Sequence, residues 1–435
     1  MGWRSPQAPF RLDRRRLHNG AAIEREAPLT VRLPAQEWSY AIAFPRLWEA
    51  GWANRPTIVS VTLQGEGGYA GVGCLQQDGS TFIDEVLCEA SDAARRVELY
   101  VPEPDLCASL MVRNAGGARR VRIDAIHTES LEDVAERGEP RRRSLEPLRN
   151  WSHYYGHRFG SLDDKIRAHR YAGLREPRII PWLDDLRLQI YPGNQMSRAI
   201  YISGVYEPNT MLALSRLLPP DGVFFDIGAN MGCFALFAAN RLRAGGRVFA
   251  FEPSSRDRAR LIANVELNRL MNVSVREEAV AESDGQAELL VAEDERGGHN
   301  TLGASFGHAR TSPAGSESVP VVKLDSFVAR EGLDRVDVIK IDIEGGEYSA
   351  LRGAEATLAR WHPALILEVV PASLEVGGRT ARALERLLRE HGYHAYEIDE
   401  TDATLVPMQS LDVPRSTNIV CIAEALARAL GATWI

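Results

Sequence analysis

The chain has 435 residues, of which 45% are hydrophobic and 25% are charged, proportions that are typical of a folded globular protein and exclude a disordered or fibrous chain. The formal net charge of −8 and the lack of a long basic stripe argue against a nucleic-acid partner, and no apolar stretch approaches the roughly 20 residues of a membrane span. The length favours two or three domains, of which we prefer two.

The cysteines and the first residues indicate a cellular compartment. The five cysteines are odd in number, widely spaced and form no C-x-x-C pair, which argues against a disulfide framework and against a zinc site. The opening stretch, MGWRSPQAPFRLDRRRL, has no long apolar core behind a basic head. We therefore expect a cytoplasmic protein.

The sequence of residues 28–127 predicts an all-β domain. Short strand-like runs such as TIVSVTL and RRVELYV are separated by Gly, Pro, Asp and Asn, which is typical of a β-sandwich or a jelly roll. In the run VRIDAIHTE, alternation places Val121, Ile123 and Ala125 on the inward face.

We divide the chain into three parts. Residues 1–127 form the β-rich domain, residues 128–182 are charged and form a connector with helices, and residues 183–435 form an α/β domain. At the start of the last part, the sequence LRLQIYPGNQMSRAIYISGVYEP predicts a hairpin that turns at residues 192–194.

After this hairpin, strands and helices alternate, which predicts a Rossmann-like α/β fold: a doubly wound, mostly parallel sheet of seven strands with helices on both faces. We expect the strands at residues 223–227, 247–251, 273–277, 336–342, 364–369, 394–398 and 417–422. We expect the helices near residues 232–242, 254–269, 345–359 and 380–391. The segment 293–318 is rich in Gly, Ser and Thr without periodicity, which predicts a lid, a binding loop or a disordered segment.

The sequence VFFDIGANMGCF, residues 223–234, runs from an expected strand through a glycine turn into an expected helix. Open α/β sheets bind ligands at the carboxyl ends of their strands. Gly228 permits the tight turn, Gly232 lets the helix approach the strand, and Asn230 offers an amide to a ligand. A plain strand-to-helix turn is the structural alternative.

A second expected strand ends in Glu252, 24 residues after Gly228, a distance that fits a carboxylate binding two ribose hydroxyls. Asp226, just before the turn, would repel a diphosphate but attract an ammonium and a sulfonium. We therefore expect S-adenosylmethionine as the cofactor rather than a dinucleotide. The alternative for Glu252 is that it caps the next helix.

The sequence VDVIKIDIEGGEYSALRG, residues 336–353, carries a second group of charges. Alternation places Lys340, Asp342 and Glu344 on one face, at the same sheet edge as the glycine turn. Asp342 is our first candidate for the base that removes a hydroxyl proton or for orienting the acceptor, with Glu344 second, and Lys340 can keep Asp342 ionised.

Two alternatives remain for these carboxylates. Asp342 or Glu344 can cap the helix that begins at residue 345. The carboxylates of Asp342 and Glu344, with that of Asp325, are also hard oxygen ligands that could hold Mg²⁺. We do not favour this alternative, and we predict no metal site.

These stretches resemble the FkbM-type methyltransferases, a branch of the class I S-adenosylmethionine-dependent enzymes. The matching text includes GVYEPNTMLALSRLLPPDGVFFDIGANMGCFALFAA, VFAFEPS and VDVIKIDIEGGEYSALRGA, in the family's order within about residues 183–423. The resemblance implies that the cofactor is bound by Asp226, Gly228, Ala229, Asn230 and Gly232, with Glu252 on the ribose and Glu278 near the adenine. It also implies that Tyr206 and Glu207 lie near the site.

The resemblance implies methyl transfer to a hydroxyl, and we expect the acceptor to be a small molecule or a glycan, such as a sugar, a polysaccharide or a glycosylated natural product. The alternatives are an NAD-dependent oxidoreductase of a nucleotide sugar and a non-catalytic glycan-binding protein. The missing third glycine argues against the first, and intact Asp226, Glu252 and Asp342 against the second. The sequence leaves open whether the protein forms a homo-oligomer.

Two further groups of residues could meet an acceptor. His299, Asn300 and Thr301 lie in the long loop. The texture of the β-rich domain is similar to that of carbohydrate-binding modules, whose aromatic side chains stack on sugar faces. The candidates there, which could equally fill a core, are Trp38, Tyr40, Trp48 and Trp52.

Overall fold

The computed structural model describes residues 15–26, 28–45, 55–132, 145, 161–302, 311–413 and 416–430. The chain splits into two compact units, one comprising Met1–Glu139 and Phe159–Arg170 and the other Pro140–Arg158 and Tyr171–Ile435. Within the described ranges, no helix combines the length and the apolar character needed to cross a bilayer.

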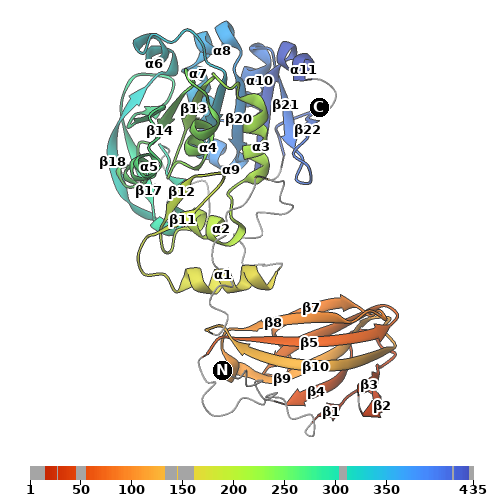
Figure 1. The fold of residues 1–435 in the computed structure, drawn as a ribbon. Coiled ribbons are helices and arrows are strands. Elements are labelled where there is room, and N and C mark those ends of the chain that lie inside the picture. Colours follow the sequence, from red (N-terminus) through yellow and green to blue (C-terminus); the bar gives the residue numbers. More distant parts are fainter. Residues whose placement is uncertain are drawn as a thin grey trace. The chain divides into compact units, whose positions relative to one another are not determined.

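The first unit consists of two antiparallel sheets (Figure 1). Its strands are β1 (Arg16–Leu17), β2 (Ala22–Glu26), β3 (Leu29–Arg32), β4 (Tyr40–Pro45), β5 (Thr57–Glu66), β6 (Tyr69–Gln76), β7 (Phe82–Glu89), β8 (Arg95–Val101), β9 (Cys107–Gly116) and β10 (Arg120–Ser130). The strand orders are β1-β4-β9-β6-β7 and β2-β3-β10-β5-β8. Phe44 from one sheet and Val59 from the other belong to one buried cluster, so the sheets pack as a sandwich. The jelly-roll alternative stays a prediction.

The predicted inward alternation of β10 is wrong in its second half. The register between β10 and β5 shifts between Ile123 and Ala125. Val121 and Ile123 are buried as predicted, but after the shift Ile126 is buried and Ala125 is only half-buried. An extra residue in one strand turns every later side chain to the opposite face.

Helix α1 (Leu162–Ala172) lies in the predicted connector and packs on the first unit. Ile166 belongs to a small buried cluster with Ile58 and Tyr100, and Lys165 forms an ion pair with Asp84. A short 3₁₀ helix, η2 (Pro104–Leu106), precedes β9. The domain boundaries predicted at residues 127 and 183 stay predictions.

The second unit contains a sheet of eight strands in the order β15-β14-β13-β19-β20-β23-β21-β22. Their bounds are β13 (Val223–Ile227), β14 (Arg247–Phe251), β15 (Val273–Arg276), β19 (Val338–Ile341), β20 (Ala364–Val369), β21 (Tyr393–Ile398), β22 (Leu405–Pro407) and β23 (Thr417–Ala423). The five strands from β15 to β20 are parallel, whereas β23 is antiparallel to both of its neighbours. The predicted number of seven is therefore wrong by one, because β22 is a three-residue edge strand that carries no alternation.

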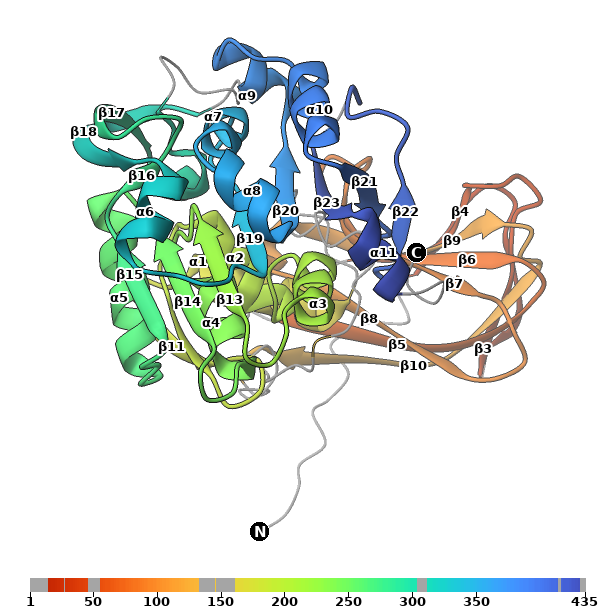
Figure 2. The ribbon, with the colours of Figure 1, turned by 90° about the horizontal axis from the view of Figure 1, so that it is seen from above.

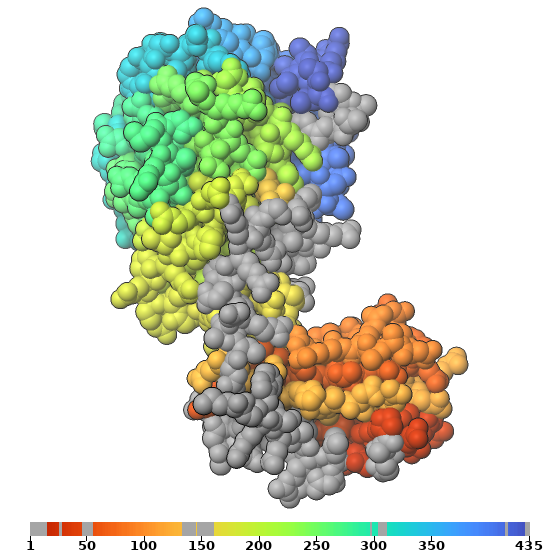
Figure 3. All heavy atoms as spheres, in the orientation of Figure 1, coloured from red at the N-terminus to blue at the C-terminus, as the bar shows by residue number. Residues whose placement is uncertain are grey.

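Helices cover both faces of this sheet, as Figure 2 shows from above. On one face α3 (Pro208–Leu217), α4 (Cys233–Arg241), α5 (Ser255–Leu267) and α11 (Glu424–Leu430) pack against a core that includes Phe224 and Ile366. On the other face α6 (Leu324–Arg330), α7 (Glu347–Arg352), α8 (Glu355–Trp361) and α10 (Ala381–Glu390) pack against a core that includes Phe225 and Leu367. In the space-filling view the layer formed by α3 and α4, in green, faces the viewer (Figure 3).

The helix expected at 345–359 is two helices, α7 and α8, that break at Gly353. A Cβ at Gly353 would overlap the carbonyl oxygen of Ala281, so the chain leaves the helical path where two segments of backbone meet. Helix α9 (Pro371–Val376), between β20 and α10, was not predicted.

The predicted hairpin at residues 192–194 is wrong. Strand β12 (Arg187–Ile190) pairs with β11 (Arg178–Pro181), which precedes it, and residue 195 begins helix α2 (Gln195–Ser203). The side chain of Asn194 accepts a hydrogen bond from the N–H of Ser197 at 2.9 Å. Asn194 is therefore a helix N-cap, a role that Asn fills as readily as a turn.

The segment 293–318 is only partly a loop. It begins with the 3₁₀ helix η4 (Asp294–His299) and ends in β18 (Pro313–Val322), which pairs with β17 (Gly285–Ala292). β18 also pairs with β16 (Ala279–Val280) to make a sheet of three strands. Residues 303–310 lie outside the described part of the chain.

Candidate active site

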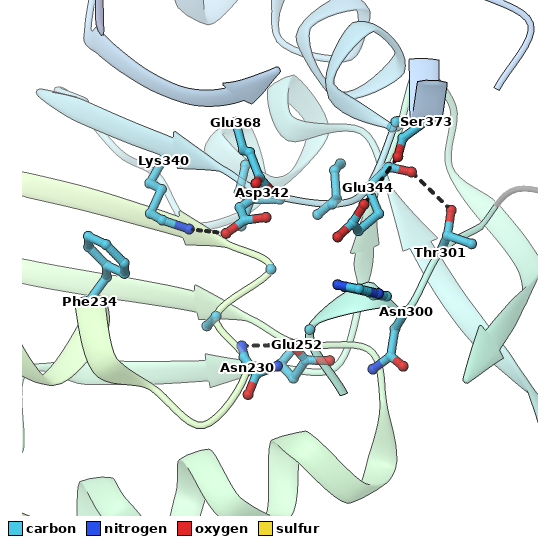
Figure 4. Close-up of a pocket in the computed structure, with 18 of the residues that line it drawn as sticks. Asn230, Phe234, Glu252, Asn300, Thr301, Lys340, Asp342, Glu344, Glu368 and Ser373 are labelled. Carbon is cyan, nitrogen blue, oxygen red and sulfur yellow. Dashed lines mark hydrogen bonds and ion pairs between the residues drawn. The ribbon is translucent and has the colours of Figure 1, made fainter. Parts of the chain in front are cut away.

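A cavity of about 850 Å³ lies at the carboxyl ends of the parallel strands (Figure 4), within the size range of small-molecule sites. Segments that follow β13, β14, β19 and β20 line it, together with the start of α3 and the η4 segment. Nine of the predicted site residues line this cavity: Glu207, Gly228, Ala229, Asn230, Glu252, Glu278, Lys340, Asp342 and Glu344. Asp226 and Gly232 do not line it.

The two glycines of the turn are required by protein packing. Gly228 has φ +81°, and a Cβ there would overlap the carbonyl oxygen of Asp342. Gly232 has φ +99°, and its Cβ would lie 2.5 Å from a methyl carbon of Leu261 on α5. The left-handed turn thus brings β13, β19 and α5 together below the cavity.

The N–H groups of the turn all donate to protein atoms. Gly228 and Ala229 donate to the carbonyl oxygen of Phe251 at 3.0 Å, and Gly232 donates to that of Ala229 at 2.9 Å. The N–H of Asn230 donates to Glu252 at 2.8 Å, and that of Met231 donates to the side-chain oxygen of Asn230 at 2.7 Å. The turn therefore lacks the row of open N–H groups that cradles a diphosphate.

Asp226 lies on β13 beneath the cavity and is 1% exposed. Neither carboxylate oxygen has a hydrogen-bond partner among the described residues. Burial raises the pKa of Asp226 to about 6, although the neighbouring Lys340, its partner in the register between β13 and β19, favours the charged form. Asp226 therefore acts on the cavity through its charge and not by direct contact.

Glu252 ends β14, and both of its oxygens are engaged. One accepts the N–H of Asn230 at 2.8 Å and the other that of Ser254, the N-cap residue of α5, at 3.0 Å. Burial, followed by the nearby Asp257, raises the pKa of Glu252 to about 8. The capping alternative is thus correct in part, but the carboxylate also lines the cavity, where its remaining lone pairs can accept hydroxyl groups.

Lys340 and Asp342 lie together at the end of β19. The Lys340 ammonium is 2.8 Å from the Asp342 carboxylate and 4.7 Å from the ring centroid of Phe234. Burial acts to raise the pKa of Asp342, but the charge of Lys340 and the hydrogen bonds with Glu368 and Lys340 together outweigh it and hold that pKa below the ordinary value. The expected ion pair between these two residues is present.

Glu344 does not continue the alternation of β19. The strand ends at Ile341, and Glu344 has a left-handed backbone with φ 53° and accepts a hydrogen bond from the Ser373 hydroxyl at 3.2 Å. The capping alternative is wrong, because α7 is preceded by Gly346 and has no side-chain cap.

The three carboxylates considered for Mg²⁺ do not gather. Asp325 accepts the N–H groups of Ala356 and Thr357, each at 2.9 Å, and lies outside the cavity. Among the residues that the structure describes, no group of three or more His, Cys, Asp or Glu side chains is arranged to hold a metal ion.

Glu278, expected near the adenine, lines the cavity and accepts a hydrogen bond from Arg330 at 2.7 Å. Glu207 lies at the start of α3 with φ 43° and is 3% exposed, and one of its oxygens has no hydrogen-bond partner in the described chain. Burial raises the pKa of Glu207 to about 7. Glu207, Asn230 and Glu344 are three non-glycine residues around this cavity whose backbones lie in the left-handed region of φ. Such a concentration of backbone strain is typical of functional sites.

Sequence reasoning missed Glu368, the penultimate residue of β20, which also lines the cavity. Its carboxyl lies beside that of Asp342 (Figure 4). Burial, and then the charge of Asp342, raise the pKa of Glu368 well above its ordinary value. The available signal was its place near the end of an apolar strand, the same place that drew attention to Glu252.

The η4 segment, residues 293–302, covers part of the cavity. Its residues His299, Asn300 and Thr301 line the cavity, as the loop hypothesis allowed. The segment is attached to α5, because Arg260 makes two hydrogen bonds to Asp294, at 2.6 and 2.8 Å, and Asn300 donates to Asp257 at 2.9 Å.

The structure describes two of the four candidate aromatic residues of the first unit, Trp38 and Tyr40. Trp38 is 53% exposed, and the guanidinium carbon of Arg113 lies 4.8 Å from its ring centroid. Tyr40 is half-buried. Trp48 and Trp52 lie outside the described residues. Glycan binding by this unit stays a prediction.

Comparison with known proteins agrees with this geometry. Residues 226–395 match the profile of the methyltransferase FkbM domain. The AMB antimetabolite synthetase AmbE of Pseudomonas aeruginosa is 30% identical over 224 residues, which cover 45% of this chain and only 10% of AmbE. The 2-O-methyltransferase NoeI of Sinorhizobium fredii is 26% identical, with 37% of this chain and 70% of NoeI covered. A solved structure of the methyltransferase FkbM from Methylobacillus flagellatus is 17% identical, with 60% of this chain and 59% of that chain covered and a TM-score of 0.31.

A further relative covers most of its own length. The 31-O-demethyl-FK506 methyltransferase FkbM of Streptomyces tacrolimicus is 32% identical over 199 residues, which cover 40% of this chain and 74% of that protein. Residues 226–395, which match the family profile, contain both Asp226 and Asp342. The chain therefore belongs to the FkbM family of methyltransferases.

Proposed function

We propose that the cavity binds S-adenosylmethionine and that this methyltransferase transfers the methyl group to a hydroxyl of a small-molecule or glycan acceptor. The observation that carries the proposal is that Glu252 and Asp342, from two different strand ends, line one cavity. A ribose held by Glu252 leaves the other end of the cofactor free to approach the charges at the end of β19.

The donor set fits S-adenosylmethionine better than a dinucleotide. The turn at Gly228 has no open N–H row for a diphosphate. Both carboxylate oxygens of buried Asp226 and one of buried Glu207 lack partners among the described residues. A ligand that carries an ammonium and a sulfonium adds positive charge near these acids and favours their ionised form. An oxidoreductase that uses NAD finds no such support, and neither does a non-catalytic role.

The cavity divides by strand into a cofactor half and an acceptor half. On the side of β13 and β14, Glu252 binds the ribose hydroxyls and Glu278 lies near the adenine. Bound there, S-adenosylmethionine supplies an electrophilic methyl group on a positively charged sulfur. On the side of β19 and β20, Asp342 and Glu368 face the acceptor, and Lys340 keeps Asp342 ionised.

Two observations favour a hydroxyl acceptor, with a sugar as the preferred case. The names of two relatives, a 31-O-demethyl-FK506 methyltransferase and a 2-O-methyltransferase, both describe oxygen as the methylated atom. The acceptor half is lined by carboxyl and amide side chains such as Asp342, Asn209 and Asn418, which accept and donate hydrogen bonds as a polyol requires.

Calorimetric titration tests the proposal. S-Adenosylmethionine and S-adenosylhomocysteine should bind the protein, and NAD and NADH should give no heat of binding. Tight binding of NAD would contradict the proposal. Incubation of candidate glycans with methyl-labelled cofactor, followed by mass spectrometry, should then find the label on an oxygen of the acceptor.

A further inference from the structure

Three adjacent strands, β19, β20 and β23, place side chains in one row across the floor of the acceptor half. Ile341 of β19 pairs with Leu367 of β20, so the residues that follow, Asp342 and Glu368, lie at the same level on adjacent parallel strands. Glu368 in turn pairs with Asn418 of β23. Since neighbouring strands are about 4.8 Å apart, two carboxyls at this level come within hydrogen-bonding reach.

The two carboxyls of this row have different surroundings. The Asp342 carboxylate is engaged by the ammonium of Lys340 at 2.8 Å, and Lys340 is itself buried, 3% exposed, over the ring of Phe234. No ion pair of Glu368 is recorded in the described part of the chain, and its side chain is less buried than those of its neighbours on β20. Asp342 therefore has its counter-ion within the protein, whereas Glu368 faces the cavity.

We propose that Glu368, and not Asp342, takes the proton of the acceptor hydroxyl, and that Asp342 is a positioning residue that acts through Glu368. This inference rests on the proposed function and names a further residue of the same site. As the hydroxyl oxygen forms its bond to the methyl carbon, its proton passes to the Glu368 carboxylate, and the sulfur keeps the electron pair of the broken carbon–sulfur bond. The proton then leaves Glu368 for solvent.

The charges around Glu368 suit it to this task. The groups that act on it are Asp342 and Glu344 after β19 and Glu207 at the start of α3, whereas Lys340 acts on Asp342. Burial and the nearby carboxylates raise the pKa of Glu368, whereas Lys340 lowers that of Asp342, so Asp342 binds a proton too weakly to be an effective base near neutral pH.

The same charges make the state of Glu368 depend on the cofactor. In the free protein, burial and the charge of Asp342 favour the protonated form of Glu368, whose carboxyl is hydrogen-bonded to Asp342. A positively charged sulfur in the cavity favours the ionised form of a nearby carboxyl. Binding of S-adenosylmethionine should therefore release a proton from Glu368 before any acceptor enters, and binding of the uncharged thioether S-adenosylhomocysteine should not.

The test is calorimetric and needs no acceptor. The whole protein is titrated with S-adenosylmethionine and with S-adenosylhomocysteine near neutral pH, in buffers of different ionisation enthalpy, which yields the number of protons released. We expect S-adenosylmethionine to release about one proton more than S-adenosylhomocysteine. Glu368→Gln should lose this difference, and Glu347→Gln, a matched control at a buried acid with a raised pKa that does not line the cavity, should keep it.

A second measurement uses the unaltered protein. Infrared difference spectra should show that a protonated-carboxyl band disappears on addition of S-adenosylmethionine and persists with S-adenosylhomocysteine. Equal proton release by the two ligands, a full difference in Glu368→Gln, or a loss of the difference in Glu347→Gln alone would overturn the inference while leaving the proposed function intact. If neither ligand binds, the proposed function fails and this inference fails with it.

Discussion

Gly228 is a residue at which the contribution of one missing side chain can be measured. With φ +81°, alanine there is strained, and its Cβ would also overlap the carbonyl oxygen of Asp342. Gly193 is a matched control, because its φ is +79° and nothing lies within 4 Å of its Cβ position. Gly193→Ala should lose about 1 kcal/mol of unfolding free energy from the strain alone. Gly228→Ala should lose about 3 kcal/mol or more in denaturant unfolding, and equal losses would show that the packing against Asp342 is not tight.

Glu252 and Asp342 should differ in their effect on cofactor binding. A charge-assisted hydrogen bond to a ribose contributes about 1.5–3 kcal/mol, so Glu252→Ala should weaken S-adenosylmethionine binding by about 10- to 100-fold in calorimetry. Asp342→Asn should leave that affinity nearly unchanged and chiefly slow turnover once an acceptor is known. Glu252→Gln separates ribose contact from folding, because the amide oxygen still accepts one of the two N–H groups now bound. A similar loss of affinity in Asp342→Asn would assign Asp342 to the cofactor half.

The η4 segment should open when its attachment to α5 is weakened. Arg260 holds Asp294 with two hydrogen bonds, which lower the pKa of Asp294 against the opposing effect of burial. Asp294→Asn removes the charge, and a loss of about 1.5–3 kcal/mol should speed hydrogen exchange in peptides covering residues 293–302 by about 10- to 100-fold. Glu355→Gln, which breaks the exposed pair with Arg352, is the control and should leave this exchange unchanged. Unaltered exchange in Asp294→Asn would mean that other contacts hold the segment.

The elements that the sequence predicted well are those whose signal is local. The strands of the parallel sheet are apolar runs that end in glycine or acid, and the two acids at Glu252 and Asp342 line the cavity as expected. The misses have two causes. Pro192, Gly193 and Asn194 fit a hairpin turn as well as the start of a helix, and the shift in β10 shows only in its pairing with β5, which is distant in sequence. Glu368 is a single acid in an apolar strand, and its importance comes from a neighbour across the sheet that no spacing reveals.

The α/β unit as a whole carries several buried acids that bind protons more tightly in the folded chain. The pKa is raised by burial to about 6 in Asp226, to about 7 in Glu207 and Glu347, and to about 8 in Glu252. The folded state therefore holds more protons than the unfolded state from the ordinary carboxyl range up to about pH 8, and its free energy of unfolding falls as the pH rises through that interval. Asp294 and Asp342 have lowered pKa values and act in the opposite sense, but only at and below the ordinary carboxyl range.

Denaturant unfolding at a series of pH values, read by pulse-labelling hydrogen exchange in the β13 and β14 peptides, should show this fall. The first unit serves as an internal contrast, because burial lowers the pKa of His169, so this residue favours folding of that unit more strongly as the pH rises to about 6.5. S-Adenosylmethionine, with its net positive charge, should stabilise the α/β unit more at pH 8 than at pH 5, because the acids it meets are then ionised. If the α/β unit instead gained stability steadily up to pH 8, the pKa values of these acids would have to be lowered by folding and not raised. Their charges would then be compensated within the free protein, and the site would not need a cationic ligand to ionise them.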